Sequence, residues 1–263
     1  MLLADLTAGA VEDAARRREV VPYAEAEAAA LAAPPAIDAA AALARDEQVH
    51  VIAEIKRASP SRGPMAEIVD PAALASAYQS GGASAISVLT EERRFGGSLD
   101  DLRAVRAAVT TPVLRKDFIA EPYQVLEARA AGADLVLLIV AALPQPLLVE
   151  LHALIADLGM TALVETHSAD ELDRAIDLGA RVIGVNARDL DTFETDPELF
   201  GRLVDRFPAD AVRVAESAVK TPDDVRRYRD AGADAVLVGE ALVTDGDPAA
   251  RIVEFRAAAE SLR

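Results

Sequence analysis

The chain has 263 residues, of which 52% are apolar, and 44 acidic residues against 27 lysines and arginines give a net charge of −17. A surface this acidic repels phosphates and anionic lipid, so we expect no nucleic-acid partner and no membrane partner. The chain lacks cysteine, which excludes disulfides, thiolate nucleophiles and cysteine-ligated zinc. Its longest apolar run, Leu135 to Leu143, is about half of what a membrane-spanning helix needs, and we expect a cytoplasmic protein.

The first 48 residues contain no strand-and-helix unit. Residues 2–19 have apolar positions at helical spacing, and the alanine-rich stretch that ends at Glu47 predicts a connector and another short helix. We expect this N-terminal helical extension, residues 1–48, to cap one end of the fold formed by residues 49–263.

Eight short apolar runs follow, each with an amphipathic helical stretch behind it. They are VHVIAEIK from Val49, SAISVLT from Ser84, PVLRKDF from Pro112, DLVLLIV from Asp134, TALVETH from Thr161, RVIGVN from Arg181, VRVAES from Val212 and DAVLVG from Asp234. Four of these runs follow a Gly-Ala pair, where glycine suits the left-handed residue that ends a helix. Strands that alternate with helices indicate a parallel sheet.

Eight equal units favour a closed barrel over an open doubly wound sheet. A glycine-rich Gly-x-Gly-x-x-Gly motif is missing after the first strand, which counts against a dinucleotide-binding fold. We therefore predict an α/β fold, a single (β/α)8 TIM barrel that forms one domain over residues 1–263.

Polar residues stand at the predicted carboxyl ends of the strands, where such barrels carry their chemistry. In chain order they are Glu54, Lys56, Thr90, Lys116, Glu165, Asn186, Glu216, Ser217 and Gly239. Glu54 and Lys56 are two apart and point to the same side of the strand, and a structural ion pair inside the barrel is the less favoured alternative for these two alone.

Lysine is rare here, with Lys56, Lys116 and Lys220 as its three positions, and two of the three lie at these strand ends. A partly desolvated lysine can act as an acid, a base or a Schiff-base nucleophile. We expect neighbouring cations, with Arg115 and Lys56 as the candidates, to lower the pKa of Lys116. Lys220 is interpreted as a solvated charge, with a phosphate contact as the less favoured alternative.

The loops AESAVKTP and LVGEAL, after the seventh and eighth strands, lie where TIM barrels commonly bind phosphate, although either could be an ordinary helix cap. The three histidines, His50, His152 and His167, lack the spacing of a metal site, so no metal and no cofactor are expected. Of these only His167 follows a strand end, and we interpret it as a loop residue. Residues 59–65 are expected to form a mobile loop over the site.

Six short sequence motifs, each in a different strand-and-helix unit, resemble those of a known protein family. They are IAEIKRASPSRG, SVLTEERRFGGSL, VLRKDFI, LVETHSADEL, IGVNARDL and VAES. In this order they are similar to the indole-3-glycerol phosphate synthases, over nearly the whole chain. The resemblance implies the conversion of 1-(2-carboxyphenylamino)-1-deoxyribulose 5-phosphate to indole-3-glycerol phosphate, carbon dioxide and water in tryptophan biosynthesis, without metal or cofactor.

The same resemblance implies roles for the charged residues. Lys116 would protonate the ribulose carbonyl as the aromatic carbon attacks it, and Lys56, with Arg188, would hold the anthranilate carboxylate. Glu165 would take up a proton in the later dehydration, and Glu54 would assist proton transfer. The sequence leaves the division of these roles open.

The other implied residues orient or bind the substrate. The orienting residues would be Asn186 and Glu216, the phosphate cradle would comprise Ser59, Ser217, Ala218, Gly239 and Glu240, and the aromatic slot would be bordered by Phe95 and Phe118. Ala218 replaces a glycine that family members usually carry. If this residue must adopt a positive φ, alanine costs about 1 kcal/mol and weakens phosphate binding.

Two other interpretations remain open. One is another phosphate-binding TIM barrel, such as a sugar-phosphate isomerase or a Schiff-base aldolase that uses Lys116. The other is a barrel that has lost activity and serves as a binding partner, although Glu54, Lys56, Lys116 and Glu165 are all retained. The expected partner is a small phosphorylated molecule. The sequence is compatible with a monomer and leaves association with other tryptophan-pathway enzymes open.

Overall fold

The computed structural model describes residues 2–59, 63–64, 68–190, 192–243 and 246–258, with only the backbone described for Ser59 and Pro64. In these ranges eight parallel strands pair in the order β1-β10-β9-β8-β7-β6-β5-β4, and β4 returns to β1 to close a barrel. The barrel strands are β1 (His50–Ile55), β4 (Ala85–Leu89), β5 (Val113–Lys116), β6 (Leu135–Ile139), β7 (Thr161–Thr166), β8 (Val182–Asn186), β9 (Val212–Glu216) and β10 (Ala235–Val238). The predicted TIM barrel is confirmed.

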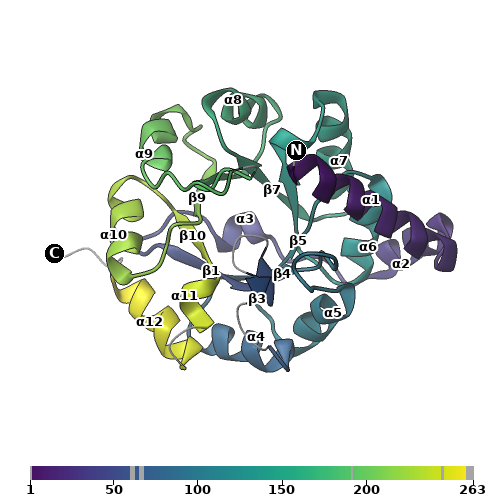
Figure 1. The fold of residues 1–263 in the computed structure, drawn as a ribbon, viewed down its shortest axis with the longest axis horizontal. Helices are drawn as coiled ribbons and strands as arrows, with labels where there is room; N and C mark the ends of the chain where they lie inside the picture. Colours follow the sequence, from purple (N-terminus) through teal and green to yellow (C-terminus); the bar gives the residue numbers. More distant parts are fainter. Residues whose placement is uncertain (1, 60–62, 65–67, 191, 244–245, 259–263) are drawn as a thin grey trace.

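Helices surround this barrel on the outside (Figure 1). In chain order they are α4 (Pro71–Ser80), α5 (Leu99–Ala108), α6 (Pro122–Ala130), α7 (Gln145–Asp157), α8 (Ala169–Asp177), α9 (Leu199–Leu203), α10 (Pro222–Asp230) and α12 (Pro248–Ala258). Short pieces lie between them, namely η1 (Val140–Ala142), η2 (Val204–Arg206) and α11 (Glu240–Val243). Several of these helices begin at a capping side chain; for example, Ser168 Oγ accepts the backbone N–H of Glu171 at the start of α8.

Glycine ends four of the helices, as the Gly-Ala pairs predict. The glycines Gly82, Gly132, Gly179 and Gly232 have φ values of 89°, 90°, 74° and 100°. Other residues rarely adopt this backbone, so glycine at these points allows each helix to end and the next strand to begin at once.

Strand alternation divides the core into two shells. On β1, Val51, Ala53 and Ile55 pack in the large cluster that also contains residues of the surrounding helices. Ile52 instead packs with inward residues of other strands, such as Leu114 and Leu163. Residues at alternate positions therefore point into the barrel or toward the helices, as period-two geometry requires.

The N-terminal extension forms α1 (Leu2–Val20), α2 (Tyr23–Ala32) and α3 (Ala39–Ala42). Its second part is two helices, where the sequence predicted one, and the break between them contains Pro34 and Pro35, which cannot continue a helix. Leu43 and the neighbouring alanines of α3 pack against the inward strand residues. Ile37 N–H donates to Asp134, just before β6, at 2.8 Å, so α3 closes the end of the barrel where the strands begin.

Helix α1 lies at the opposite end of the barrel, where the strands end, and Figure 1 shows it beside α2 and α6. A small antiparallel pair, β2 (Ala58–Ser59) with β3 (Gly63–Pro64), stands in the loop after β1 and was not predicted. Most of the loop of residues 59–65, expected to be mobile, lies outside the described residues. In the part of the chain that the structure describes, no helix has the length and apolar character needed to cross a membrane.

Candidate active site

A cavity of about 640 Å³ opens at the carboxyl ends of the barrel strands. It is lined by thirteen of the fourteen residues proposed from the sequence, namely Glu54, Lys56, Phe95, Lys116, Phe118, Glu165, Asn186, Arg188, Glu216, Ser217, Ala218, Gly239 and Glu240. The side chain of the fourteenth, Ser59, lies outside the described residues. The cavity lining also includes apolar residues that the sequence analysis did not single out, among them Leu137 and Ile139. Their inward positions on β6 are the signal that could have found them.

The same alternation that forms the barrel interior aims the charged side chains into the cavity. Lys116 stands two residues after inward Leu114, and Glu165 stands two after inward Leu163. Glu216 likewise follows inward Val214. The ends of separate strands thus bring these groups to one point, because a side chain keeps its face at every second residue.

Lys116 lies between two buried carboxylates. Its Nζ is 3.0 Å from Glu165 Oε2 and 3.1 Å from Glu216 Oε2. Burial alone would lower the pKa of Lys116, but the carboxylates of Glu165, Glu216 and Glu54 outweigh burial and raise this pKa above its ordinary value. Lys116 is therefore an ammonium ion at neutral pH.

The expectation that Arg115 and Lys56 lower the pKa of Lys116 is wrong. Arg115 occupies an outward position on β5, where it binds Asp117 Oδ2 at 2.9 Å and Thr90 Oγ1 at 3.1 Å. Lys56 is itself paired with the buried Glu54 carboxylate. Arg115 therefore points away from the cavity, and the charge of Lys56 is balanced by Glu54 at the end of β1.

The two carboxylates beside Lys116 titrate differently. Burial would raise the pKa of Glu165, but Lys116 and His167 hold it well below its ordinary value. Burial raises the pKa of Glu216 and, although Lys116 opposes the shift, the nearby Glu165 carboxylate adds to it, so that the pKa reaches about 8. Of the two, Glu165 thus favours the ionised form, and Glu216 binds a proton more readily. Pairs of groups with separated pKa values are typical of acid–base sites.

Asn186 fixes the orientation of Glu165. Its Nδ2 donates to Glu165 Oε1 at 3.1 Å, while its Oδ1 accepts the Ser217 hydroxyl at 2.8 Å and the backbone N–H of Arg188 at 3.0 Å. Because the amide oxygen is held by two donors, its NH2 group must face the carboxylate.

Two glycines leave room for the carboxylates. A Cβ at Gly239 would lie 2.6 Å from Glu54 Oε1, and a Cβ at Gly184 would lie 2.0 Å from Glu216 Oε1. Neither position accepts a side chain without movement of the carboxylate. Gly239 was predicted from its place after the last strand, whereas Gly184, inside β8, was not singled out.

The loop after β9 has an unusual backbone. Ser217 and Ala218 have φ values of 66° and 59°, in the left-handed region that glycine favours. The positive φ considered for Ala218 is therefore present. This loop is followed by Lys220, which is exposed at the edge of the cavity as a solvated charge would be.

Ala218→Gly is expected to stabilise the protein by about 1 kcal/mol, because glycine adopts this φ without a steric penalty, and to lower KM for a phosphorylated substrate. Urea unfolding and steady-state kinetics measure the two effects. The matched control is Ala231→Gly, at a position with φ of −75°, where the same change should destabilise. A loss of stability in Ala218→Gly as large as in the control would show that the positive φ of Ala218 does not strain the backbone.

Three phenylalanines line the cavity, namely Phe95, Phe118 and Phe193, and the ring centroids of Phe95 and Phe118 are 6.1 Å apart. The loop that carries Phe95 is organised by Glu91, which accepts the backbone N–H groups of Arg94 and Phe95 at 2.7 and 2.9 Å. Arg93 of this loop donates from Nε to the Asp13 carboxylate on α1 at 2.9 Å.

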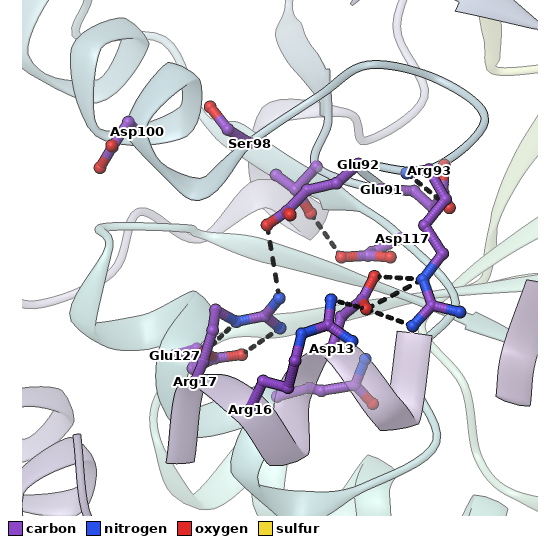
Figure 2. A network of polar contacts seen from close by, with 12 residues as sticks. Asp13, Arg16, Arg17, Glu91, Glu92, Arg93, Ser98, Asp100, Asp117 and Glu127 are labelled. Atoms are coloured by element: carbon purple, nitrogen blue, oxygen red, sulfur yellow. Dashed lines mark hydrogen bonds and ion pairs between the residues drawn. The ribbon is translucent and has the colours of Figure 1, made fainter. Parts of the chain in front are cut away.

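Figure 2 shows this contact beside a second one, in which Arg17 of α1 lies between Glu92 and Glu127. Arg17 Nε is 2.6 Å from Glu127 Oε1, on α6. Ion pairs thus attach α1 to the loop after β4 and to α6. The sequence could not indicate these pairs, because their partners are 80 and 110 residues away along the chain.

His167, interpreted from the sequence as a loop residue, does follow β7, but it also contacts the site. Its Nε2 is 3.3 Å from Glu165 Oε1, and its Nδ1 is 3.2 Å from Glu171 Oε2. The spacing of two residues between Glu165 and His167 was the signal that could have indicated this contact. Among the described residues, no group of three or more histidine, aspartate or glutamate side chains could hold a metal ion.

A closed (β/α)8 barrel with an ammonium ion and carboxylates of separated pKa at the ends of its strands defines a TIM-barrel enzyme of acid–base chemistry. The comparisons with known proteins give the family. Residues 3–255 match the family model described as indole-3-glycerol phosphate synthase, and the chain belongs to that family.

Relatives that bear the name indole-3-glycerol phosphate synthase align over almost their whole length. The one from Leifsonia xyli subsp. xyli is 69% identical and covers 97% of this chain and 98% of its own. Those from Beutenbergia cavernae and Mycobacterium avium are each 56% identical, with 98% and 97% of this chain and 95% and 93% of their own covered.

Solved structures of lower identity share the fold. 3-Hexulose-6-phosphate synthase has a TM-score of 0.61 at 20% identity, over 80% of this chain and 99% of that one. Thiamine phosphate pyrophosphorylase from Pyrococcus furiosus has a TM-score of 0.60 at 17% identity, over 82% of this chain and 97% of that one.

Proposed function

We propose that this chain converts 1-(2-carboxyphenylamino)-1-deoxyribulose 5-phosphate to indole-3-glycerol phosphate, carbon dioxide and water, as a carbon–carbon lyase of tryptophan biosynthesis. The observation that carries the proposal is the Lys116 ammonium between Glu165 and Glu216 in a cavity whose lining includes the phenylalanines Phe95, Phe118 and Phe193. The family membership supports the same reaction.

Lys116 is the general acid in this proposal. The aromatic carbon that bears the carboxylate attacks the ribulose carbonyl, and the carbonyl oxygen takes a proton from Lys116 Nζ and becomes a hydroxyl. Because the adjacent carboxylates raise the pKa of Lys116, the proton is present at neutral pH. Carbon dioxide then leaves from the attacking carbon. The hydroxyl takes a second proton, from Lys116 after solvent has returned the first, and departs as water, while the carbon between it and the nitrogen loses a proton to Glu165.

Glu165 is the base of the dehydration, and this assignment rests on the separated pKa values. Lys116 and His167 lower the pKa of Glu165, which favours the ionised form that can accept a proton, whereas burial raises the pKa of Glu216, which orients the Lys116 ammonium. Asn186 holds Glu165 at 3.1 Å, which supports a fixed position for the base. Glu54, paired with Lys56, assists proton transfer.

The remaining residues bind the three parts of the substrate. Lys56 and Arg188 would hold the anthranilate carboxylate until it leaves, while Phe95 and Phe118 would contact the aromatic ring. The phosphate would bind at the loops after β9 and β10, through Ser217, Ala218, Gly239 and Glu240. The family resemblance adds Ser59, whose side chain lies outside the described residues. The positive charges of Lys56 and Arg188 attract an anionic substrate to the cavity of a protein whose net charge is −17.

The test is the growth of indole fluorescence when the substrate is added to the purified protein without added metal. The chain contains no tryptophan, so the background is low. A signal is expected, and borohydride added during turnover should leave no covalent adduct on the protein. Lack of signal from folded protein would overturn the proposal, and a trapped adduct on Lys116 would favour a Schiff-base aldolase instead.

A further inference from the structure

His167 occupies a place that the mechanism above does not use. Its side chain is 13% exposed, and the described residues that line the cavity include Glu165 but not His167. The ring lies on the side of Glu165 away from Lys116, since His167 contacts Oε1 and Lys116 contacts Oε2. His167 therefore touches the proposed base without lining the cavity.

The ring is held in one orientation by the first turn of α8. Glu171 Oε2 accepts the backbone N–H of His167 at 2.8 Å and lies 3.2 Å from its ring Nδ1. Glu171 is itself placed by Ser168, whose hydroxyl accepts its backbone N–H at 3.3 Å. With Nδ1 fixed toward Glu171, Nε2 must point to Glu165.

Each ring nitrogen thus faces a carboxylate. A neutral imidazole carries one N–H and can present it to only one of them, whereas an imidazolium carries two. Nδ1 hydrogen-bonds to Glu171, and Nε2 lies within ion-pair distance of Glu165, at 3.3 Å, without the geometry of a hydrogen bond. Two flanking carboxylates consequently favour the doubly protonated ring on geometry alone.

The surrounding charges agree with this state. The groups that face His167 are Glu165 on β7 and Glu171 on α8, with Lys116 on β5 and Glu216 on β9 beyond Glu165. Burial would lower the pKa of His167, but the two contacting carboxylates raise it to about 10.

We propose that His167 is a positioning residue, an imidazolium that holds Glu165 ionised and attracts Oε1, the oxygen to which Asn186 donates, so that Oε2 remains directed to Lys116 and the substrate. The inference rests on the proposed function, in which Glu165 is the base. The Glu171–His167–Glu165 chain extends the site from the barrel interior to the start of α8.

The first experiment records the ring nitrogen signals of the protein labelled with 15N-histidine as a function of pH. With three histidines in the chain, the His167 signals are identified as those missing from His167→Gln. We expect His167 to stay an imidazolium at pH 8. A neutral ring at pH 8 would overturn the proposal, and this result does not depend on whether the protein turns over the substrate.

The second experiment measures kcat against pH for His167→Gln, in which the amide can still donate a hydrogen bond but carries no charge. Loss of the cation should raise the pKa of Glu165, so the acid limb of the profile should move up by about one pH unit. KM should change little, because His167 does not line the cavity. An unchanged acid limb would overturn the proposal.

Two further variants complete the design. His152→Gln is the matched control, since His152 lies on α7 and burial lowers its pKa, and its acid limb should stay in place. Glu171→Gln retains His167 and removes its outer anion. The ring pKa should then fall in the 15N titration, whereas the acid limb should not move up, because the ring is still an imidazolium at that pH. An unchanged ring pKa in Glu171→Gln would overturn the proposal, which keeps the test decisive if His167→Gln does not fold.

Discussion

Lys116→Met is expected to lower kcat about a thousandfold, because a general acid in position contributes about 10²–10⁴ to the rate. The substitution leaves the cavity shape nearly unchanged but removes the only proton donor 3 Å from both carboxylates among the described side chains. It should also raise the pKa values of Glu165 and Glu216, both of which Lys116 lowers. Product fluorescence under saturating substrate gives kcat.

Lys116→Arg separates proton donation from charge. Arginine keeps the positive charge between Glu165 and Glu216, but its pKa is too high for it to give up a proton during turnover. We expect kcat to fall nearly as far as in Lys116→Met, with the thermal midpoint close to that of the unmodified protein. Retention of most activity in Lys116→Arg would show that charge alone suffices and would contradict the assignment of Lys116 as the acid.

Arg115→Met is expected to lower the free energy of unfolding by about 3–5 kcal/mol, because it leaves a buried carboxylate without its cation. Arg115 has a side chain that is 1% exposed, and it donates to Asp117 Oδ2, Thr90 Oγ1 and the carbonyl of Gln124. Asp117 is 5% exposed and cannot recover the interaction from water. Urea unfolding measures the loss.

The matched control for this loss is Arg103→Met on the outer face of α5. Arg103 pairs with Asp100 at 2.7 Å, but the two side chains are 54% and 90% exposed, so the pair contributes no more than about 1 kcal/mol. Equal losses in the two variants would mean that the Arg115 contacts contribute no more than a surface ion pair.

The positions of the catalytic-face residues could be predicted because strand alternation is visible in the sequence. Eight apolar runs define the barrel, and residues such as Glu54 and Lys116 stand at their carboxyl ends. The same alternation places Arg115 outside the barrel, so the strand pattern itself contradicts the expectation that Arg115 lowers the pKa of Lys116. In that case the sequence contained the answer.

The electrostatics of the site could not be predicted in this way. The pKa of Lys116 depends on Glu165 and Glu216, which are 49 and 100 residues further along the chain, and on which of their oxygens face the ammonium. The sign of the shift follows from a balance between burial and these charges, which only the three-dimensional arrangement fixes. The role inferred for His167 depends in the same way on the turn that brings Glu171 to its ring.

The barrel closes by pairing its first strand with its last, and this has a consequence for the order in which the chain folds. During synthesis β1 emerges early, but its partner β10 ends at Val238, so one edge of β1 stays unpaired until nearly all of the chain has been made. Helix α1 also cannot make its ion pairs until later, because Arg93 lies 80 residues after its partner Asp13, and Glu127 lies 110 residues after its partner Arg17. Such distant contacts slow folding. A nascent chain therefore exposes an open sheet for most of its time on the ribosome, and the finished enzyme forms only in the last steps.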